Sequence, residues 1–396
     1  MKHDQRYIWL DLVRGISAIA VCAGHLRAAL LVDYSALHEP TKLQALFYFS
    51  TGLGHQAVMV FFVLSGLFVG GSILKSREEF KLATYSIARL TRLWMVLIPA
   101  LAVTLLVDNI VAIYAPEVLQ GAYNSAWNSG PKSAESFSNS ALTFLGNILF
   151  VQNIFTPVFG TNGPLWSLAN EFWYYITFPL LALSVGQCGD SRKLSVRALG
   201  GIAGILLLLF LPDGIRTGFL VWLMGVVVYF ACKCLSSKRR PFVLICTSTL
   251  FLGSLAYSKS TPWQTAFGVP SDYIVGVCFS MFCVVIAIWP PPRGSLFGRA
   301  ISKIAGAVSE FSYSLYLSHF PFVILIAVFG IGFMKVLPDT KGLVQFFGWL
   351  GVLLFLGMLF WFLFERHTNF IKRKVISRIR RHSSRLAPIP VYSDEK

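Results

Sequence analysis

The sequence has 396 residues, of which 55% are hydrophobic and only 13% are charged, and its mean hydropathy is +0.65. This composition excludes a disordered protein, a disulfide-rich scaffold and an ordinary soluble enzyme, and it indicates a polytopic membrane protein. The net charge of +16 is typical either of a nucleic-acid-binding protein or of a charge asymmetry across a bilayer, and the positions of the basic residues decide between the two.

Apolar runs long enough to cross a membrane recur along the whole chain. A helix needs about 20 such residues to cross ~30 Å of hydrocarbon. The sequence predicts an all-α fold, a membrane bundle of about ten transmembrane helices at residues 8–32, 56–74, 93–113, 164–184, 198–212, 216–232, 242–257, 271–289, 304–330 and 342–364. The stretch 141–158 contains Asn147, Gln152 and Asn153, so we expect a re-entrant or interfacial segment there.

The basic residues orient these spans, because cytoplasmic loops collect lysine and arginine. With ten spans and both termini in the cytoplasm, most of the 34 lysines and arginines lie on the cytoplasmic side. Counting 141–158 as a full span would put most of the later basic loops outside. We therefore expect a transmembrane domain over 1–366 and a basic cytoplasmic tail over 367–396, which is either an amphipathic helix on anionic lipid or a plain anchor. The charge asymmetry needs no nucleic acid to explain it.

The first span, LDLVRGISAIAVCAGHL, carries ionisable residues that a bilayer disfavours. Arg14 and His25 lie on one face of a helix, with a rise between them of roughly 16 Å. Asp11 precedes Arg14 by three residues and can pair with it. Arg14 alone could be a snorkelling anchor, and His25 could bond a neighbouring helix. An imidazole in the outer half of a bilayer is also suited to take a proton from a hydroxyl group.

The fourth span carries a carboxylate, Glu171, about as far from its outer end as His25 is from the outer end of the first span. We therefore expect Glu171 and His25 to face each other at one depth, as an orienting acid and a general base. The alternative is a structural hydrogen bond from Glu171 to its surroundings. Trp166 is first an interfacial aromatic residue and only second a surface on which a sugar could stack.

Two other spans contribute polar side chains that we expect to support the site. In SYSLYLSHFPF of the ninth span, Ser312, Tyr316 and His319 recur at helical spacing and form a polar stripe. In FFVLSGLFVGG of the second span, Ser65 and Gly66 favour close helix packing, with a ligand role secondary.

Arg89 and Arg92, in YSIARLTRLW, stand three residues apart at the inner end of the third span. They are either topology signals or a clamp for a phosphate group. Motifs for a metal site or a nucleotide-binding loop are absent from the sequence, so no metal cofactor is expected.

Taken together, these blocks resemble the acyltransferase-3 family of bacterial inner-membrane proteins. The family's Arg and His in the first span match Arg14 and His25, its FFVLSG block matches 61–66, and its R-x-x-R matches Arg89 and Arg92. LWSLANEFWYY and SYSLYLSHFPF match two further blocks in the same order, and the resemblance extends from about residue 6 to 366. One departure is Asn170, which stands where many members have a second carboxylate before the one matched by Glu171.

The resemblance implies a membrane acyltransferase that moves an acyl group, commonly acetyl, from cytosolic acetyl-CoA or another acyl-CoA to a hydroxyl of a glycan, lipid-linked saccharide or other molecule at the outer face. It places catalysis at His25 and Glu171 and acyl-CoA binding at Arg14, Arg89 and Arg92. We expect no fused extracytoplasmic esterase-like domain. The alternative is a proton-coupled secondary transporter, because buried His and Glu also form proton relays, although no similarity between two halves of the chain is visible. A third alternative is a non-catalytic membrane assembly or sensor subunit. This alternative does not explain why Arg14 and His25 lie on the same face of the first span.

Overall fold

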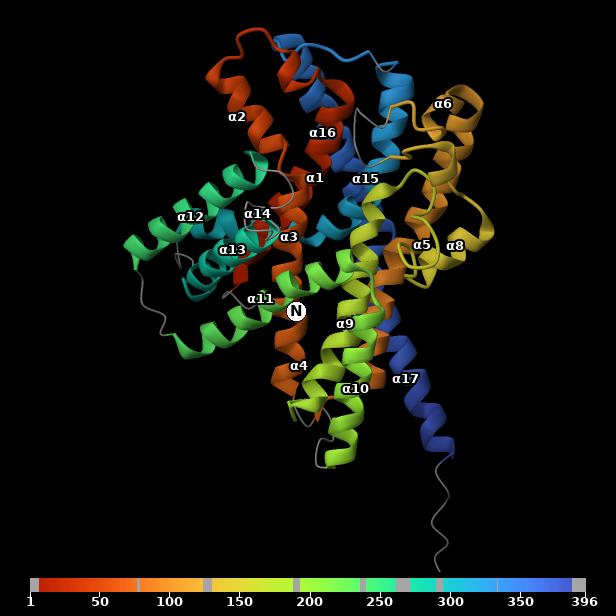
Figure 1. Cartoon of the computed structure of the whole chain (residues 1–396), viewed down its shortest axis with the longest axis vertical. Coiled ribbons are helices and arrows are strands. Elements are labelled where there is room, and N and C mark those ends of the chain that lie inside the picture. Colours follow the sequence, from red (N-terminus) through yellow and green to blue (C-terminus); the bar gives the residue numbers. More distant parts are fainter. Residues whose placement is uncertain are drawn as a thin grey trace, which may run out of the picture.

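The structure is a computed structural model that describes residues 7–76, 79–123, 130–187, 193–235, 240–260, 271–289, 295–332 and 334–386, with side chains as far as Ile379. The first six residues and the end of the expected basic tail, 387–396, lie outside the described residues. Within the described part the chain is all-α (Figure 1). Helices α11, α12 and α13 gather on one side of the bundle and α5, α6 and α8 on the other (Figure 1).

Among the described residues, eight helices are long and apolar enough to cross a membrane, so the chain is a polytopic helical membrane protein. In chain order these spans are Ile8–Leu30 (α1), Gly54–Ser76 (α3, η3 and α4), Leu82–Tyr114 (α5), Asp213–Cys234 (α11), Pro241–Ser260 (α12), Ser271–Ile288 (α13), Ser312–Gly330 (α15 and η7) and Thr340–Ile379 (α16, η8 and most of α17). Helix α17 as a whole covers Thr368–Leu386, and the remaining helices include α2 (Lys42–Thr51), α6 (Pro116–Leu119), α8 (Ala141–Ile148) and α14 (Leu296–Glu310).

The fourth and fifth expected spans are present as helices α9 (Trp166–Ser184) and α10 (Leu194–Phe210), but they are not among these eight. They pack against each other through glycines of α10. A Cβ atom on Gly204 would lie 2.8 Å from Leu181, and one on Gly200 would lie 3.1 Å from Leu183. The pair therefore forms a closely packed hairpin at the edge of the bundle.

The ninth span begins later in the structure than the predicted range 304–330. The helix breaks at Phe311, so that α14 ends at Glu310 and the span starts at Ser312. Helix α14 is amphipathic and lies against α1, where a Cβ atom on Gly15 would be only 2.3 Å from Val308. The apolar residues of 304–310 thus cover α1 and do not extend the membrane span.

Glycine brings α3 and α11 into backbone contact near the centre of the bundle, as the small residues after Ser65 predicted. A Cβ atom on Gly66 would lie 1.9 Å from the carbonyl oxygen of Trp222, and one on Gly225 would lie 1.9 Å from that of Val63. The helix continues through Gly66–Gly70 (η3) as a π-helical turn. Such turns shift the side chains that follow them and are frequent at functional sites.

The stretch 141–165 does not cross the bundle as one helix. After the eight residues of α8 the chain runs as irregular backbone to a short 3₁₀ turn, Gly163–Leu165 (η6), which leads directly into α9. Several of its polar groups bond inside the protein: the Asn147 amide donates to the carbonyls of Thr143 and Pro157 at 2.9 and 3.1 Å, and the Asn162 amide donates to the Leu317 carbonyl at 3.0 Å. Irregular backbone is stable away from water only when it is bonded in this way.

Candidate active site

The structure contains a cavity of about 860 Å³ whose wall includes His25, here called the His25 cavity. One face of α1 contributes Val21, Gly24, His25, Arg27 and Ala28, a spacing that follows the helical turn. The carboxyl-terminal end of α2 lies beside this face, because a Cβ atom on Gly24 would be 2.8 Å from the carbonyl oxygen of Thr51. Trp166 and Tyr316 also line the cavity.

His25 is held between two aromatic rings of α15. Its imidazole stacks on that of His319 with 5.3 Å between centroids and an angle of 28°, and Phe320 meets it edge-on at 4.9 Å. His319 is 1% exposed, and its Nδ1 donates to the Tyr316 carbonyl at 2.8 Å. The Nε2 atom of His319 has no hydrogen-bond partner among the described residues. His25 therefore lies beside His319 of the polar stripe predicted in the ninth span.

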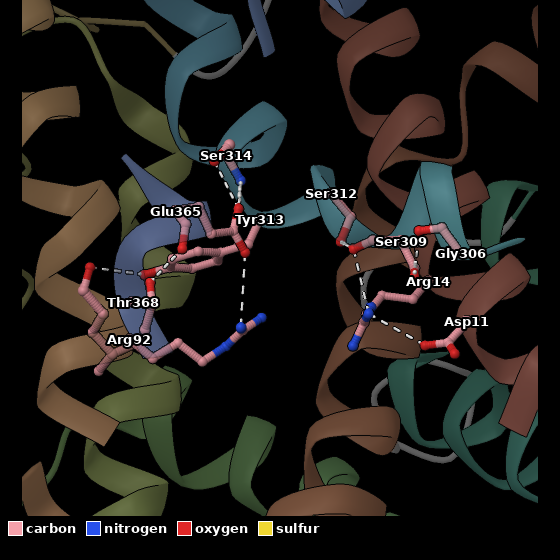
Figure 2. Close-up of polar contacts among 11 residues, drawn as sticks. Asp11, Arg14, Arg92, Gly306, Ser309, Ser312, Tyr313, Ser314, Glu365 and Thr368 are labelled. Atoms are coloured by element: carbon pink, nitrogen blue, oxygen red, sulfur yellow. Dashed lines mark hydrogen bonds and ion pairs between the residues drawn. The ribbon is translucent and has the colours of Figure 1, made fainter. Parts of the chain in front are cut away.

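A second cavity, of about 440 Å³, is lined by all three arginines that the sequence singled out, and we call it the arginine cavity. Its wall also includes Asp11, Ser65, Glu171, Tyr175 and Tyr313. Arg14 pairs with Asp11 at 3.2 Å and donates to the Ser309 carbonyl at 3.3 Å (Figure 2). The helical spacing correctly predicted the pair of Asp11 and Arg14.

Arg92 and Arg89 have different surroundings in this cavity. Arg92 lies 3.7 Å from the carboxylate of Glu365 and over the ring of Tyr313 (Figure 2). Arg89 lies over the rings of Tyr85 and Tyr175, and among the described residues it makes no ion pair. Its Nε is buried without a hydrogen-bond partner. Arg89 is therefore the cation of the three that is most available to an anionic ligand.

Glu171 lines the arginine cavity and not the His25 cavity. The prediction that Glu171 and His25 face each other is therefore wrong. Its carboxylate accepts from the Ser65 hydroxyl at 2.8 Å and from the Tyr175 hydroxyl. The error comes from the assumed depth of α9. Because the irregular stretch before it enters the bundle, α9 begins with Trp166 already packed against Phe62 of α3.

Three residues line both cavities: Val58, Phe62 and Tyr316. The Tyr316 hydroxyl bonds the Ser167 hydroxyl at 2.7 Å and lies 3.2 Å from the Pro164 carbonyl. The two cavities are thus neighbours that share a wall of three side chains. The sequence predicted a supporting role for Tyr316 but not this position between the two groups of polar residues.

The sequence reasoning missed a histidine–carboxylate pair in the wall of the His25 cavity. The Nε2 atom of His55 on α3 lies 2.8 and 3.0 Å from the two carboxylate oxygens of Asp272 on α13. The imidazole also stacks on Trp166, with 6.4 Å between centroids and an angle of 19°. Asp272 carries the available signal, since it is an ionisable residue at the start of an expected span.

Comparison with known proteins shows to which family the chain with these two cavities belongs. The family model described as "Acyltransferase domain" matches residues 7–366, which is nearly the whole chain. The chain belongs to the acyltransferase-3 family. As a member of this family it is an acyltransferase, and the alternative of a transporter is set aside.

The chain is also similar to "Acyltransferase MdmB" of Streptomyces mycarofaciens. The two are 26% identical over 334 residues, which cover 78% of this chain and 76% of that protein. No solved structure matches the chain. The family model and this relative therefore indicate an acyltransferase, and they name neither its donor nor its acceptor.

Proposed function

We propose that this acyltransferase moves an acyl group, commonly acetyl, from cytosolic acyl-CoA to a hydroxyl of a glycan, lipid-linked saccharide or other acceptor at the extracytoplasmic face of a bacterial inner membrane. In this proposal α9 and α10 complete ten spans, both termini are cytoplasmic and 141–158 is re-entrant. The observation that carries the proposal is the pair of neighbouring cavities, one with three arginines and one with His25.

The arginine cavity is the proposed donor site. Acyl-CoA carries phosphate groups, and guanidinium groups bind phosphate through charge-assisted, often bidentate, hydrogen bonds. Arg14 and Arg92 are held in place by Asp11 and Glu365, whereas Arg89 makes no ion pair among the residues that the structure describes. The lower part of the bundle, with α4 and α17, is then the cytoplasmic end (Figure 1).

The His25 cavity is the proposed site of transfer. The acyl thioester reaches it from the arginine cavity, and His25 takes the proton of the acceptor hydroxyl while the hydroxyl oxygen attacks the thioester carbonyl. The bond from carbonyl carbon to sulfur breaks, and the CoA thiolate leaves and takes up a proton. Transfer through an acyl-His25 intermediate is a variant of the same scheme. The stacked His319 fixes the orientation of the His25 ring.

The same cavity offers groups that would hold the acceptor. His55 and Asp272 are polar partners for hydroxyl groups, and the Trp166 ring is a flat apolar surface beside them. Glu171 lies on the donor side, where its bond to Ser65 joins α9 to α3 and its bond to Tyr175 lies within α9. Its proposed role is accordingly to position the wall of the donor site, and it is not a partner of His25.

Inside-out membrane vesicles that contain the protein test this function. Given radiolabelled acetyl-CoA, they should transfer label to membrane-associated glycan, and His25→Ala should abolish the transfer. His38→Ala is the matched control, because His38 is exposed and lines neither cavity. Full transfer by His25→Ala at normal expression would contradict the assignment of His25. CoA-independent accumulation of an unmodified solute would contradict the proposed reaction.

A further inference from the structure

The wall between the two cavities consists of the side chains of Val58, Phe62 and Tyr316. All three are buried, with exposures of 5%, 3% and 8%. Val58 and Phe62 are one turn apart on α3, and Tyr316 faces them from α15, where its ring meets Phe61 at 5.8 Å. A group that moves directly from the arginine cavity to His25 has to pass between these side chains.

Hydrogen bonds and ring contacts hold this wall in place. The hydroxyl of Tyr316 bonds Ser167, which lines the arginine cavity, and lies within 3.2 Å of the carbonyl of Pro164, which lines the His25 cavity. Phe62 packs edge-on against Trp166 and Tyr174. The wall is therefore a close-packed part of the interior, where one additional methyl group requires side chains to move.

We propose that this wall is the passage of the acyl group and that it selects acyl groups by cross-section, accepting unbranched ones and rejecting those branched next to the carbonyl. The inference rests on the proposed function, because an acyl-CoA must enter from the arginine cavity. The acyl group is the leading end of that molecule, and an unbranched chain is no wider than the arm that follows it. A methyl branch next to the carbonyl widens the leading end and meets Val58 and Phe62.

The expected discrimination follows from the size of one methyl group. A packed site separates substrates that differ by one methylene by about 10- to 200-fold. Butyryl-CoA and isobutyryl-CoA have the same composition and differ only in branching. We therefore expect wild-type protein to use butyryl-CoA at least about tenfold faster than isobutyryl-CoA. Acetyl-CoA, the smallest of the three, passes without obstruction.

Three buried valines give a matched set of variants for the test. Val58 lines both cavities, Val69 only the arginine cavity and Val221 only the His25 cavity. Their exposures are 5%, 4% and 1%. Each is changed to alanine, and CoA release from acetyl-, butyryl- and isobutyryl-CoA is measured in inside-out vesicles, with vesicles that lack the protein as background.

Val58→Ala should lower the ratio of butyryl to isobutyryl turnover about tenfold, whereas Val69→Ala and Val221→Ala should leave it within about twofold of wild type. Val58→Ile narrows the passage and should raise the ratio. This variant replaces Val58→Ala in the test if the alanine variant does not accumulate in the membrane. A ratio that responds to Val69 or Val221 and not to Val58 overturns the inference, as does a wild-type ratio near one. If no acyl-CoA is turned over by wild-type protein, the proposed function itself is wrong.

Discussion

The imidazole of His25 stacks on that of His319, with 5.3 Å between their centroids. His319 is in turn fixed by the hydrogen bond from its Nδ1 to the carbonyl of Tyr316 one turn earlier in α15. The orientation of the proposed catalytic base therefore depends on a second histidine that is buried and bonded to its own helix. This arrangement joins α1 to α15 at the level where the two cavities meet.

His319→Ala should reduce acyl transfer by about 100-fold, because a displacement of a catalytic group by about 1 Å costs a rate factor of this size. His319→Phe is the matched variant, since it keeps an aromatic ring beside His25 and loses only the hydrogen bond. It should reduce transfer by no more than about tenfold. Rates are measured with labelled acetyl-CoA and normalised to the amount of protein in the vesicles. Equal rates for the two variants and wild type would show that the stacking does not position His25.

Glu365→Ala should destabilise the protein by about 1–3 kcal/mol, because it removes a buried carboxylate and leaves the half-buried Arg92 without its partner. The backbone N–H of Ser314 also loses the acceptor to which it donates at 3.1 Å. The measurement is the unfolding free energy of purified protein in detergent. The double variant Arg92→Ala with Glu365→Ala should recover part of the loss, because no unpaired charge then remains. A double variant no more stable than Glu365→Ala would argue against this account.

The sequence was sufficient to predict one ion pair within a helix and one cluster of arginines from two helices. The pair of Asp11 and Arg14 follows from a spacing of three residues, and the gathering of the arginines follows from their places near one end of their spans. The ionisable residues that the sequence analysis did not identify form pairs between positions far apart in the chain. His55 and Asp272 are 217 residues apart, so only the packing of α3 against α13 brings them together.

The misplacement of Glu171 has a different physical cause. Counting residues from the outer end of the fourth span gives the depth of Glu171 only if every span begins at the membrane surface. The stretch 141–165 lowers the start of α9 into the bundle, where the Asn147 side chain accepts from the backbone N–H of Phe159 and the Asp108 carboxylate accepts from that of Thr161. Hydropathy does not record such an entry, because the stretch is apolar like a span but is not continuously helical.

The pair of His55 and Asp272 gives a prediction that separates the acceptor side from the donor side. Asp272→Asn removes the charge but keeps a side-chain oxygen that can accept the hydrogen bond from His55. If the pair holds the acceptor, His55→Ala should reduce transfer of label to glycan by about tenfold or more, and Asp272→Asn should reduce it less. Binding of acetyl-CoA to the purified protein should be unchanged in both. Weakened acetyl-CoA binding would place the pair on the donor side instead.

Gly160 provides a test of whether the irregular stretch before α9 is a fixed part of the bundle. Its φ is +56°, and a Cβ atom there would lie 1.9 Å from the Asp108 carboxylate. That carboxylate accepts from the backbone N–H and hydroxyl of Thr161 at 3.1 and 2.6 Å. Gly160→Ala should therefore both strain the backbone and displace Asp108, at a cost of at least about 2 kcal/mol.

The control for Gly160→Ala is Gly253→Ala in α12, where a Cβ atom meets nothing within 4 Å. Alanine in a helix interior is about 0.5–1 kcal/mol more favourable than glycine, so this variant should be as stable as wild type or slightly more so. Both unfolding free energies are measured in the same detergent. If the two variants have the same stability, the stretch 141–165 rearranges freely around position 160. The start of α9, and with it the place of Glu171 in the arginine cavity, would then not be fixed by the bond between Asp108 and Thr161.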